Sequence, residues 1–194
     1  MSKAVSRTPP VIVWLRQDLR VTDNPALTAA ADTGYPVLPV YILDDANAGD
    51  WTMGAASRWW LHQSLKSLKE SLGGHLRFLR GDASAILRRL AERLDAVGVY
   101  WNRCHEPWRI DRDHRIKAEL KRNGRLVASF NGSLLFEPQD VAKADGSPYK
   151  VFTPFYRKGC LGDAPPPRIP LSAPRLSNFD ESPLGLALDE LALR

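Results

Sequence analysis

The sequence predicts an α/β fold in which a five-stranded parallel sheet is covered by helices on both faces. Short β-branched apolar runs alternate with longer segments of helical spacing. The runs that predict strands are 11–15, 37–43, 76–79, 97–101 and 126–130. The helical segments between them are 25–31, 55–72, 83–94 and 107–121. Because strands that alternate with helices are joined by right-handed crossovers, we expect one doubly wound parallel sheet.

The helices have local sequence signals at their faces and ends. The 55–72 segment has one apolar face, because leucines recur at helical spacing at Leu61, Leu65, Leu68 and Leu72. Asp82 is a suitable N-cap for the next helix. Gly73, Gly74 and Gly124 are expected to end the second and fourth helices. The resulting Rossmann-like or flavodoxin-like domain is expected to cover residues 8–132.

Beyond this domain the alternating pattern stops. Residues 133–160 form a loop-rich segment with interleaved aromatic residues, which we interpret as an extension of the domain. Residues 161–194 contain repeated prolines and are interpreted as a linker. The last stretch, LGLALDELALR, has an apolar helical face that nothing in the chain obviously covers. We therefore expect the segment from about Leu161 onward to be poorly packed.

Composition favours a globular binding domain in the cytoplasm. The chain has 194 residues, of which 44% are hydrophobic and 25% charged, so global disorder is excluded. No apolar run approaches the roughly 18–20 residues of a membrane helix, and the N-terminus has no apolar signal region. Two cysteines and four histidines without metal-ligand spacing argue against a disulfide framework or structural zinc. The net charge of +5 comes from basic residues beside acidic ones, which indicates solvated helix faces.

Motifs for phosphate binding and nucleophilic catalysis are missing from the positions where they would be expected. The turn after the first strand, RQDLRVTDNPAL, contains no glycine, which excludes a GxGxxG or P-loop phosphate cradle there. The sequence has no GxSxG motif. We therefore predict no catalytic residues and interpret the chain as a binding domain.

A ligand crevice is expected at the carboxyl ends of the strands, where the strand order reverses. Residues at the ends of the first, second and fourth strands suit a flat, partly polar heteroaromatic ring: Arg16, Tyr41, Leu43, Asn102, Cys104 and Glu106. The start of the helix after the second strand should supply another wall, formed by Met53, Ala55 and Ser57.

Several of these residues also have a structural interpretation. The first turn could be locked by an ion-pair network of Arg16, Asp18, Arg20 and Asp23. Structural roles are assigned to Asp18, Arg20, Asp23 and Asn24. Glu106 could be only a helix-start carboxylate, and Cys104 an ordinary small apolar neighbour. Trp59 and Trp60 are expected to serve in packing rather than in ligand contact.

Five segments resemble the DNA photolyase and cryptochrome family, in the family's order. They are WLRQDLRVTDNPAL (14–27), residues 53–57, YWNRCHEPWRIDRD (100–113), FNGSLLFEP (130–138) and PYKVFTPFYRK (148–158). The resemblance implies an N-terminal antenna domain that binds a small light-harvesting chromophore. It also implies that FAD lies in a separate C-terminal helical domain, which is expected to be missing after Arg194.

The resemblance further implies what the parent protein does. A photolyase of this family repairs cyclobutane pyrimidine dimers with blue light, and contacts damaged DNA only through the FAD domain. The fragment alone should then be inactive, and no membrane partner is expected. The alternatives are the same domain of a cryptochrome photoreceptor, or a free-standing flavin- or nucleotide-binding module.

The antenna chromophore in this family is a deazaflavin, methenyltetrahydrofolate or occasionally a flavin such as FMN. Folate-binding relatives have further Asn and Glu contacts at the helix start after Glu106, where this sequence has Trp108 and Arg109. The 100–113 segment is more similar to the deazaflavin-binding members. The resemblance therefore favours a deazaflavin.

Overall fold

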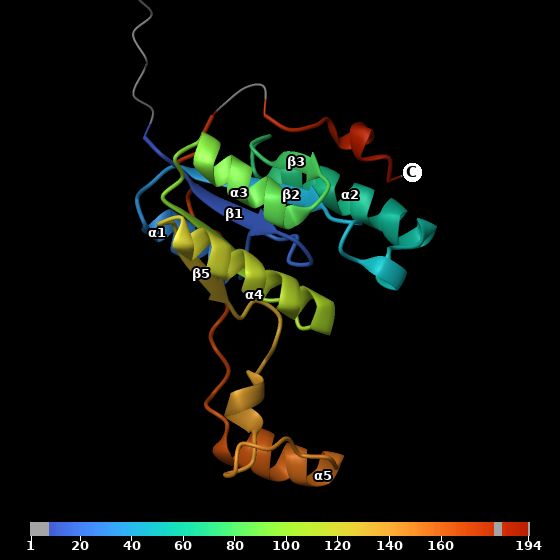
Figure 1. Cartoon of the computed structure of the whole chain (residues 1–194). Helices are drawn as coiled ribbons and strands as arrows, with labels where there is room; N and C mark the ends of the chain where they lie inside the picture. The colour runs from blue at the N-terminus through green and yellow to red at the C-terminus, as the bar shows by residue number, and fades with distance from the viewer. Residues whose placement is uncertain (1–7, 181–183, 194) are drawn as a thin grey trace, which may run out of the picture. The chain divides into compact units, whose positions relative to one another are not determined.

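The central sheet is parallel throughout and has the order β3-β2-β1-β4-β5 (Figure 1). The computed structural model describes residues 8–180 and 184–193, with only the backbone described at residue 163. Its strands are β1 (Val11–Leu15), β2 (Val37–Leu43), β3 (Arg77–Arg80), β4 (Gly98–Asn102) and β5 (Leu126–Phe130). The predicted fold class is confirmed, and each strand end lies within one residue of its prediction.

Helices connect successive strands as predicted. They are α1 (Pro25–Asp32), α2 (Ala55–Ser71), α3 (Ala83–Arg93) and α4 (Pro107–Arg122). The Asp82 carboxylate accepts hydrogen bonds from the backbone N–H groups of Ser84 and Ala85, which confirms the predicted N-cap. Gly73, Gly74 and Gly124 adopt positive φ angles just after α2 and α4, a conformation that suits glycine at the end of a helix.

Each face of the sheet has its own hydrophobic core, because successive strand side chains point to opposite faces. Val11, Val13 and Leu15 of β1 pack with α1 and α2, and the core on this face includes the four predicted α2 leucines. Ile12 and Trp14 face the other way and pack with residues of α3 and α4, among them Leu87 and Ile116. Both faces of β1 are thus buried, as in other doubly wound sheets.

Part of the C-terminal segment packs against the sheet, contrary to the expectation from its prolines. Residues 171–180 and 184–193 belong to the same compact unit as the sheet, whereas residues 165–170 are exposed. Val37 donates a backbone hydrogen bond to Ser177 (2.7 Å), and Leu186 donates one to Phe78 (2.8 Å). Leu191 and Leu193 are buried in the α1–α2 core, where they cover apolar surface that the helices leave open. Residues 181–183 and 194 of the expected linker lie outside the described residues.

Residues 133–170 form a second compact unit. It contains the short helical turns η2 (Pro138–Val141), α5 (Phe152–Pro154) and η3 (Phe155–Asp163), where the sequence analysis expected loops. Proline in the first turn of a helix is tolerated because its missing N–H has no intrahelical partner there, so Pro138 and Pro154 do not prevent these turns. The Phe152 and Tyr156 rings stack with centroids 5.7 Å apart.

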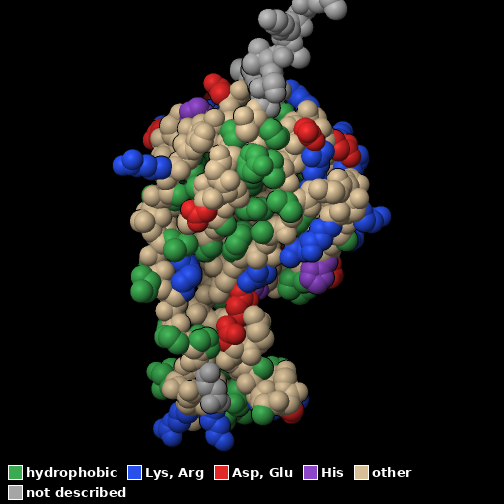
Figure 2. All heavy atoms as spheres, turned by 90° about the vertical axis from the view of Figure 1, so that its left-hand side faces the viewer, with side chains coloured by type: hydrophobic (Ala, Val, Ile, Leu, Met, Phe, Trp, Pro, Cys, Tyr) green, Lys and Arg blue, Asp and Glu red, His purple; other side chains and the backbone are tan. Residues whose placement is uncertain are grey.

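Charged side chains of both signs are interspersed over the molecular face seen in Figure 2. The arrangement is typical of solvated helix faces rather than of one continuous basic stripe. In the described part of the chain, no helix is long and apolar enough to cross a membrane.

Candidate functional site

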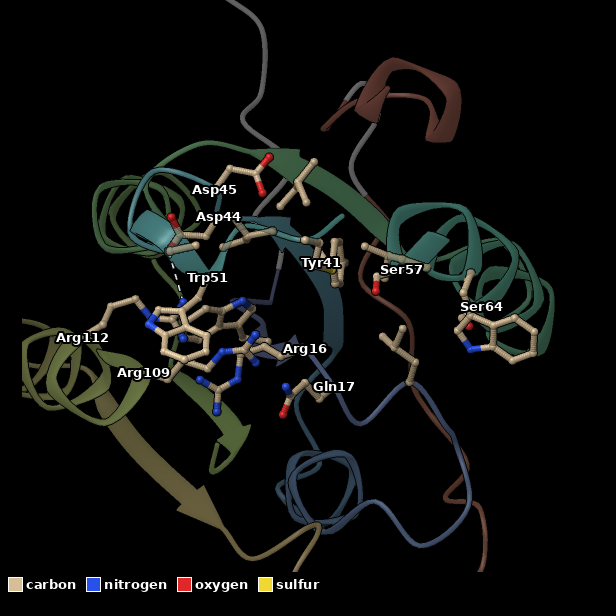
Figure 3. Close-up of a pocket in the computed structure, with 18 of the residues that line it drawn as sticks. Arg16, Gln17, Tyr41, Asp44, Asp45, Trp51, Ser57, Ser64, Arg109 and Arg112 are labelled. Atoms are coloured by element: carbon tan, nitrogen blue, oxygen red, sulfur yellow. Dashed lines mark hydrogen bonds and ion pairs between the residues drawn. The ribbon is translucent and has the colours of Figure 1, made fainter. Parts of the chain in front are cut away.

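A cavity of about 640 Å³ lies at the carboxyl ends of β1 and β2. Figure 3 shows Trp51, Arg109 and Arg112 on one side of it and Ser57 and Ser64 of α2 on the other. Arg16 and Tyr41 lie between these two sides. The cavity is lined by four of the six tryptophans in the chain, Trp14, Trp51, Trp60 and Trp108.

The structure brings five of the nine predicted contact residues to this cavity: Arg16, Tyr41, Leu43, Met53 and Ser57. They come from the ends of β1 and β2 and from the chain that leads into α2, as predicted. The other four lie outside the lining that the described residues form: Ala55, Asn102, Cys104 and Glu106. Whether any of the nine contacts a ligand stays a prediction.

Asn102 is held inside the protein by hydrogen bonds. Its amide nitrogen donates to Asp18 Oδ2 (2.6 Å) and Asn24 Oδ1 (2.7 Å), and its amide oxygen accepts from the backbone N–H of Ala26 (3.1 Å). A Cβ atom on Gly132 would lie 2.6 Å from Asn102 Cγ, so this glycine allows a close approach of the chain. The side chain of Asn102 therefore joins β4 to α1 and to the turn after β1.

The polar residues of the turn after β1 are held by hydrogen bonds to backbone groups and by an ion pair between Arg20 and Asp23 (3.7 Å). Asp18 accepts from the backbone N–H of Arg16 (2.8 Å), and Asn24 caps α1 by accepting from Leu27 N–H (3.2 Å). Arg20 donates to the carbonyl of Gly132 (2.5 Å) and to that of Asp23 (2.8 Å). Asp23 accepts from the backbone N–H of Leu171 (3.2 Å), which ties this turn to the C-terminal segment.

Glu106 and Cys104 lie outside the lining formed by the described residues, but both contact residues that belong to it. Glu106 accepts a hydrogen bond from Gln17 (2.8 Å) and pairs with Arg109 (3.7 Å). Burial of the Glu106 carboxyl opposes its ionisation, but hydrogen bonds from its own backbone N–H and from Gln17 outweigh this effect and lower its pKa. Burial raises the pKa of the Cys104 thiol despite the nearby Arg16 and Arg109, so Cys104 is not an activated thiolate.

A buried ion cluster, which the sequence analysis did not identify, adjoins the cavity, and three of its members, Arg16, Asp44 and Arg112, belong to the lining. Asp113 pairs with Arg16 (2.5 Å) and with Arg112 (3.0 Å), and Arg112 also pairs with Asp44 (3.1 Å). The guanidinium carbons of Arg16 and Arg112 lie 4.5 and 4.7 Å from the centroid of Trp14. We call these five residues the inner wall: Trp14, Arg16, Asp44, Arg112 and Asp113.

Tyr41 contributes a neutral hydroxyl to the cavity. Burial raises the pKa of Tyr41 well above its ordinary value, and the nearby carboxylate of Asp45 acts in the same direction. Arg109 and Arg58 oppose this shift without cancelling it. The hydroxyl therefore stays protonated near neutral pH and can donate a hydrogen bond.

The outer part of the cavity is exposed and aromatic. Trp51 is 78% exposed and Trp60 is 68% exposed, and we call these two residues with Arg109 the mouth. The expectation that Trp59 and Trp60 are packing residues was wrong, because both point away from the core and Trp59 is 52% exposed. The sequence did contain a signal of their exposure, because Trp59 and Trp60 do not fall on the helical repeat of the leucines that form the buried face of α2. In the part of the chain that the structure describes, no cluster of metal-ligating side chains is found.

Comparison with known proteins identifies the family. The model of the DNA photolyase family matches residues 11–171. The deoxyribodipyrimidine photo-lyase of Agrobacterium fabrum is 44% identical over 172 residues, which cover 87% of this chain and 35% of that protein. Cryptochrome-1 of Arabidopsis thaliana is 39% identical over 168 residues, covering 84% of this chain and 24% of the relative.

Solved structures agree with this match. A bacterial class III photolyase from Agrobacterium tumefaciens superposes with a TM-score of 0.85 at 39% identity, covering 98% of this chain and 39% of that one. A Synechocystis cryptochrome has the same fold, with a TM-score of 0.81 at 24% identity. The chain spans about a third or less of the length of these two curated relatives. The chain belongs to the DNA photolyase family.

Proposed function

We propose that this domain binds a planar light-harvesting chromophore and serves as the antenna of a photolyase that repairs cyclobutane pyrimidine dimers with blue light. The observation that carries the proposal is the cavity of about 640 Å³, which has four tryptophans in its lining. Its size lies within the usual range of roughly 300–1,000 Å³ for small-molecule sites. Its position, at the carboxyl ends of parallel strands, is the usual ligand position in doubly wound folds.

The residues of the cavity fit a flat heteroaromatic group. Indole rings offer stacking surface, while Arg16, Gln17 and Tyr41 offer hydrogen-bond donors that would fix the orientation of a ring. We favour a deazaflavin because the 100–113 segment is similar to that of deazaflavin-binding members. Methenyltetrahydrofolate and FMN are the other candidates. The bound chromophore would absorb light and transfer excitation energy to FAD.

We assign FAD and the damaged DNA to the part of the parent protein that this chain does not span. Repair needs reduced flavin and the lesion held together in one dedicated pocket. This chain by itself is therefore expected not to repair DNA. A structure neighbour from Sulfolobus tokodaii is described as an archaeal photolyase with two FAD molecules, with the implication of a novel light-harvesting cofactor, but at 23% identity it supports only the fold.

The second candidate is the equivalent domain of a cryptochrome photoreceptor. The 39% identity to Arabidopsis cryptochrome-1 supports it, whereas the higher identity to the Agrobacterium enzyme over a similar length favours a photolyase. Dimer repair by the full-length parent under blue light would support the photolyase, and flavin photoreduction without repair would support the cryptochrome.

Chromophore binding can be tested with two variants that differ only in whether the new side chain enters the cavity. Ser57 lines it and Ala55 lies outside its lining, yet both are exposed in the first turn of α2. We expect Ser57→Trp to weaken binding of the chromophore by at least about tenfold, since an indole would occupy its space. Ala55→Trp should bind as the wild type does.

The measurement is a titration of the wild-type chain with deazaflavin, methenyltetrahydrofolate and FMN in turn, followed by chromophore absorbance and by quenching of tryptophan fluorescence. Saturable binding of one of them, lost in Ser57→Trp alone, supports the antenna assignment. Absence of binding by all three, or equal loss in both variants, contradicts it.

A further inference from the structure

Two buried hydrogen-bond donors of the inner wall have no partner within the described part of the chain. They are Trp14 Nε1 and Arg16 Nε. Trp14 is 1% exposed and Arg16 is 7% exposed, and both residues line the cavity. A buried N–H group without a partner costs about 1–3 kcal/mol, so proteins rarely keep such groups without a reason.

Arg109, which also lines the cavity, has a third such nitrogen, but this Nε lies 3.7 Å from the carboxylate of its ion-pair partner Glu106. Arg16 donates from one terminal nitrogen to Asp113 and from the other to the carbonyl of Asn102, so Nε is its one nitrogen without a hydrogen bond among the described residues. The guanidinium lies against the Trp14 ring, with its carbon 4.5 Å from the ring centroid. The two free donors therefore belong to side chains in direct contact.

The charge of the inner wall indicates which kind of acceptor these donors suit. The two arginines, Arg16 and Arg112, are paired with the two carboxylates of Asp44 and Asp113. Because these charges balance, the inner wall offers little attraction to an anion, and burying a further charge there would be costly. The inner wall instead offers hydrogen-bond donors to a neutral acceptor.

The mouth has a different character. Arg109 also lines the cavity, and its side chain is 20% exposed against 5% for that of Arg16, while its partner Glu106 is part-exposed. An ionic or strongly hydrated group of a ligand is accommodated there without complete loss of water. The cavity thus has a neutral donor end and a solvated end.

We propose that the chromophore enters ring first, and that Trp14 Nε1–H and Arg16 Nε–H donate hydrogen bonds to neutral acceptors on its ring, a carbonyl oxygen or an unprotonated ring nitrogen. The charged or hydrated tail then lies at the mouth. This inference rests on the proposed antenna function and makes Trp14 and Arg16 determinants of ligand orientation. All three candidate chromophores have a ring carbonyl group, so the inference concerns orientation whichever of them binds.

The test compares Trp14→Phe, which removes the Nε1–H and keeps an aromatic ring, with Trp59→Phe, the same change outside the cavity lining that the described residues form. Deazaflavin, methenyltetrahydrofolate and FMN are titrated into each protein. We expect about tenfold weaker binding in Trp14→Phe, the usual effect of leaving one buried hydrogen bond unmade, and no change in Trp59→Phe.

The carbonyl stretching band of the bound chromophore gives a second readout that a purely structural effect would not move. In the wild-type complex this band should lie below its position in an aprotic solvent, because hydrogen bonding weakens the C=O bond. It should shift upward in Trp14→Phe. This measurement on the wild type remains decisive even if Trp14→Phe does not fold.

The outcomes separate this inference from the antenna assignment. If none of the three compounds binds the wild type, both are overturned. If one binds but its carbonyl band matches the aprotic value, or if Trp14→Phe binds it as tightly as the wild type with an unmoved band, the orientation inference alone is overturned. Unchanged affinity and an unmoved carbonyl band in Trp14→Phe would mean that water, and not the chromophore, accepts the hydrogen bonds of the two donors.

Discussion

The inner wall and the mouth of the cavity differ in how the rest of the protein holds them. Residues of the inner wall are buried, paired in ion contacts and packed against Trp14, whereas Trp51 and Trp60 at the mouth are mostly exposed. Side chains with many buried partners cannot move without loss of stability, while exposed ones can adjust to a ligand. Changes to the inner wall should therefore affect folding first, and changes to the mouth should affect binding alone.

The largest effect is expected for Asp113→Ala. The substitution leaves Arg16 and Arg112 buried with one carboxylate fewer, which should lower the free energy of unfolding by about 3–5 kcal/mol. Urea unfolding followed by circular dichroism measures this loss. Asp111→Ala, an exposed carboxylate on the same helix, should stay within about 0.5 kcal/mol of the wild type. Equal stability of both variants would contradict the structural role of the inner wall.

A smaller loss is expected for Gly132→Ala. The new Cβ would lie 2.6 Å from Asn102 Cγ, and the shift of Asn102 would disturb its hydrogen bonds to Asp18 and Asn24. We expect a destabilisation of about 1–3 kcal/mol in the same urea experiment. Gly54→Ala is the matched control, because no atom lies within 4 Å of its Cβ position, and it should be nearly neutral. If Gly132→Ala were also neutral, the close packing of residues 130–132 against β4 would not matter for stability.

The smallest effect on stability, and a clear one on binding, is expected at the mouth. Trp60→Ala should change the free energy of unfolding by less than about 0.5 kcal/mol, because the side chain is 68% exposed. Loss of its stacking surface should weaken chromophore binding by about tenfold. Trp59→Ala removes the neighbouring indole, which is outside the lining of the cavity that the structure describes, and should not alter affinity. A Trp60→Ala protein that unfolds easily would remove the distinction between the two regions.

The sequence was most informative where a pattern repeats. Strands and helices lie within one residue of their predicted ends, because alternating apolar runs and capping residues such as Asp82 act locally. Arg16 and Tyr41 could be placed at the cavity because the ends of parallel strands meet at one edge of the sheet.

Contacts between distant segments could not be predicted in this way. Asn102 also follows a strand, but its amide is used by Asp18 and Asn24, which are about 80 residues away in the chain. In the sequence, Arg112 and Asp113 belong to a charged helical segment and would be expected at the surface. In the structure they are buried because Arg112 pairs with Asp44 and Asp113 pairs with Arg16. Trp51 ends a 3₁₀ turn of three residues, Gly49–Trp51, which is too short to show a periodic pattern, so its position at the mouth had no sequence signal.

The C-terminal segment has a consequence for how the domain is completed during synthesis. Strand β3 is at the edge of the sheet, and its carbonyl at Phe78 accepts a hydrogen bond from the backbone of Leu186, while Leu191 and Leu193 cover the core beside α2. These partners are translated more than a hundred residues after Phe78, once the whole sheet has been made. A nascent chain that has reached only residue 132 therefore carries five strands, an unpaired edge and an uncovered apolar surface. At that stage it is open to pairing with other chains or to capture by a chaperone, and this surface is covered only when Leu191 and Leu193 have left the ribosome.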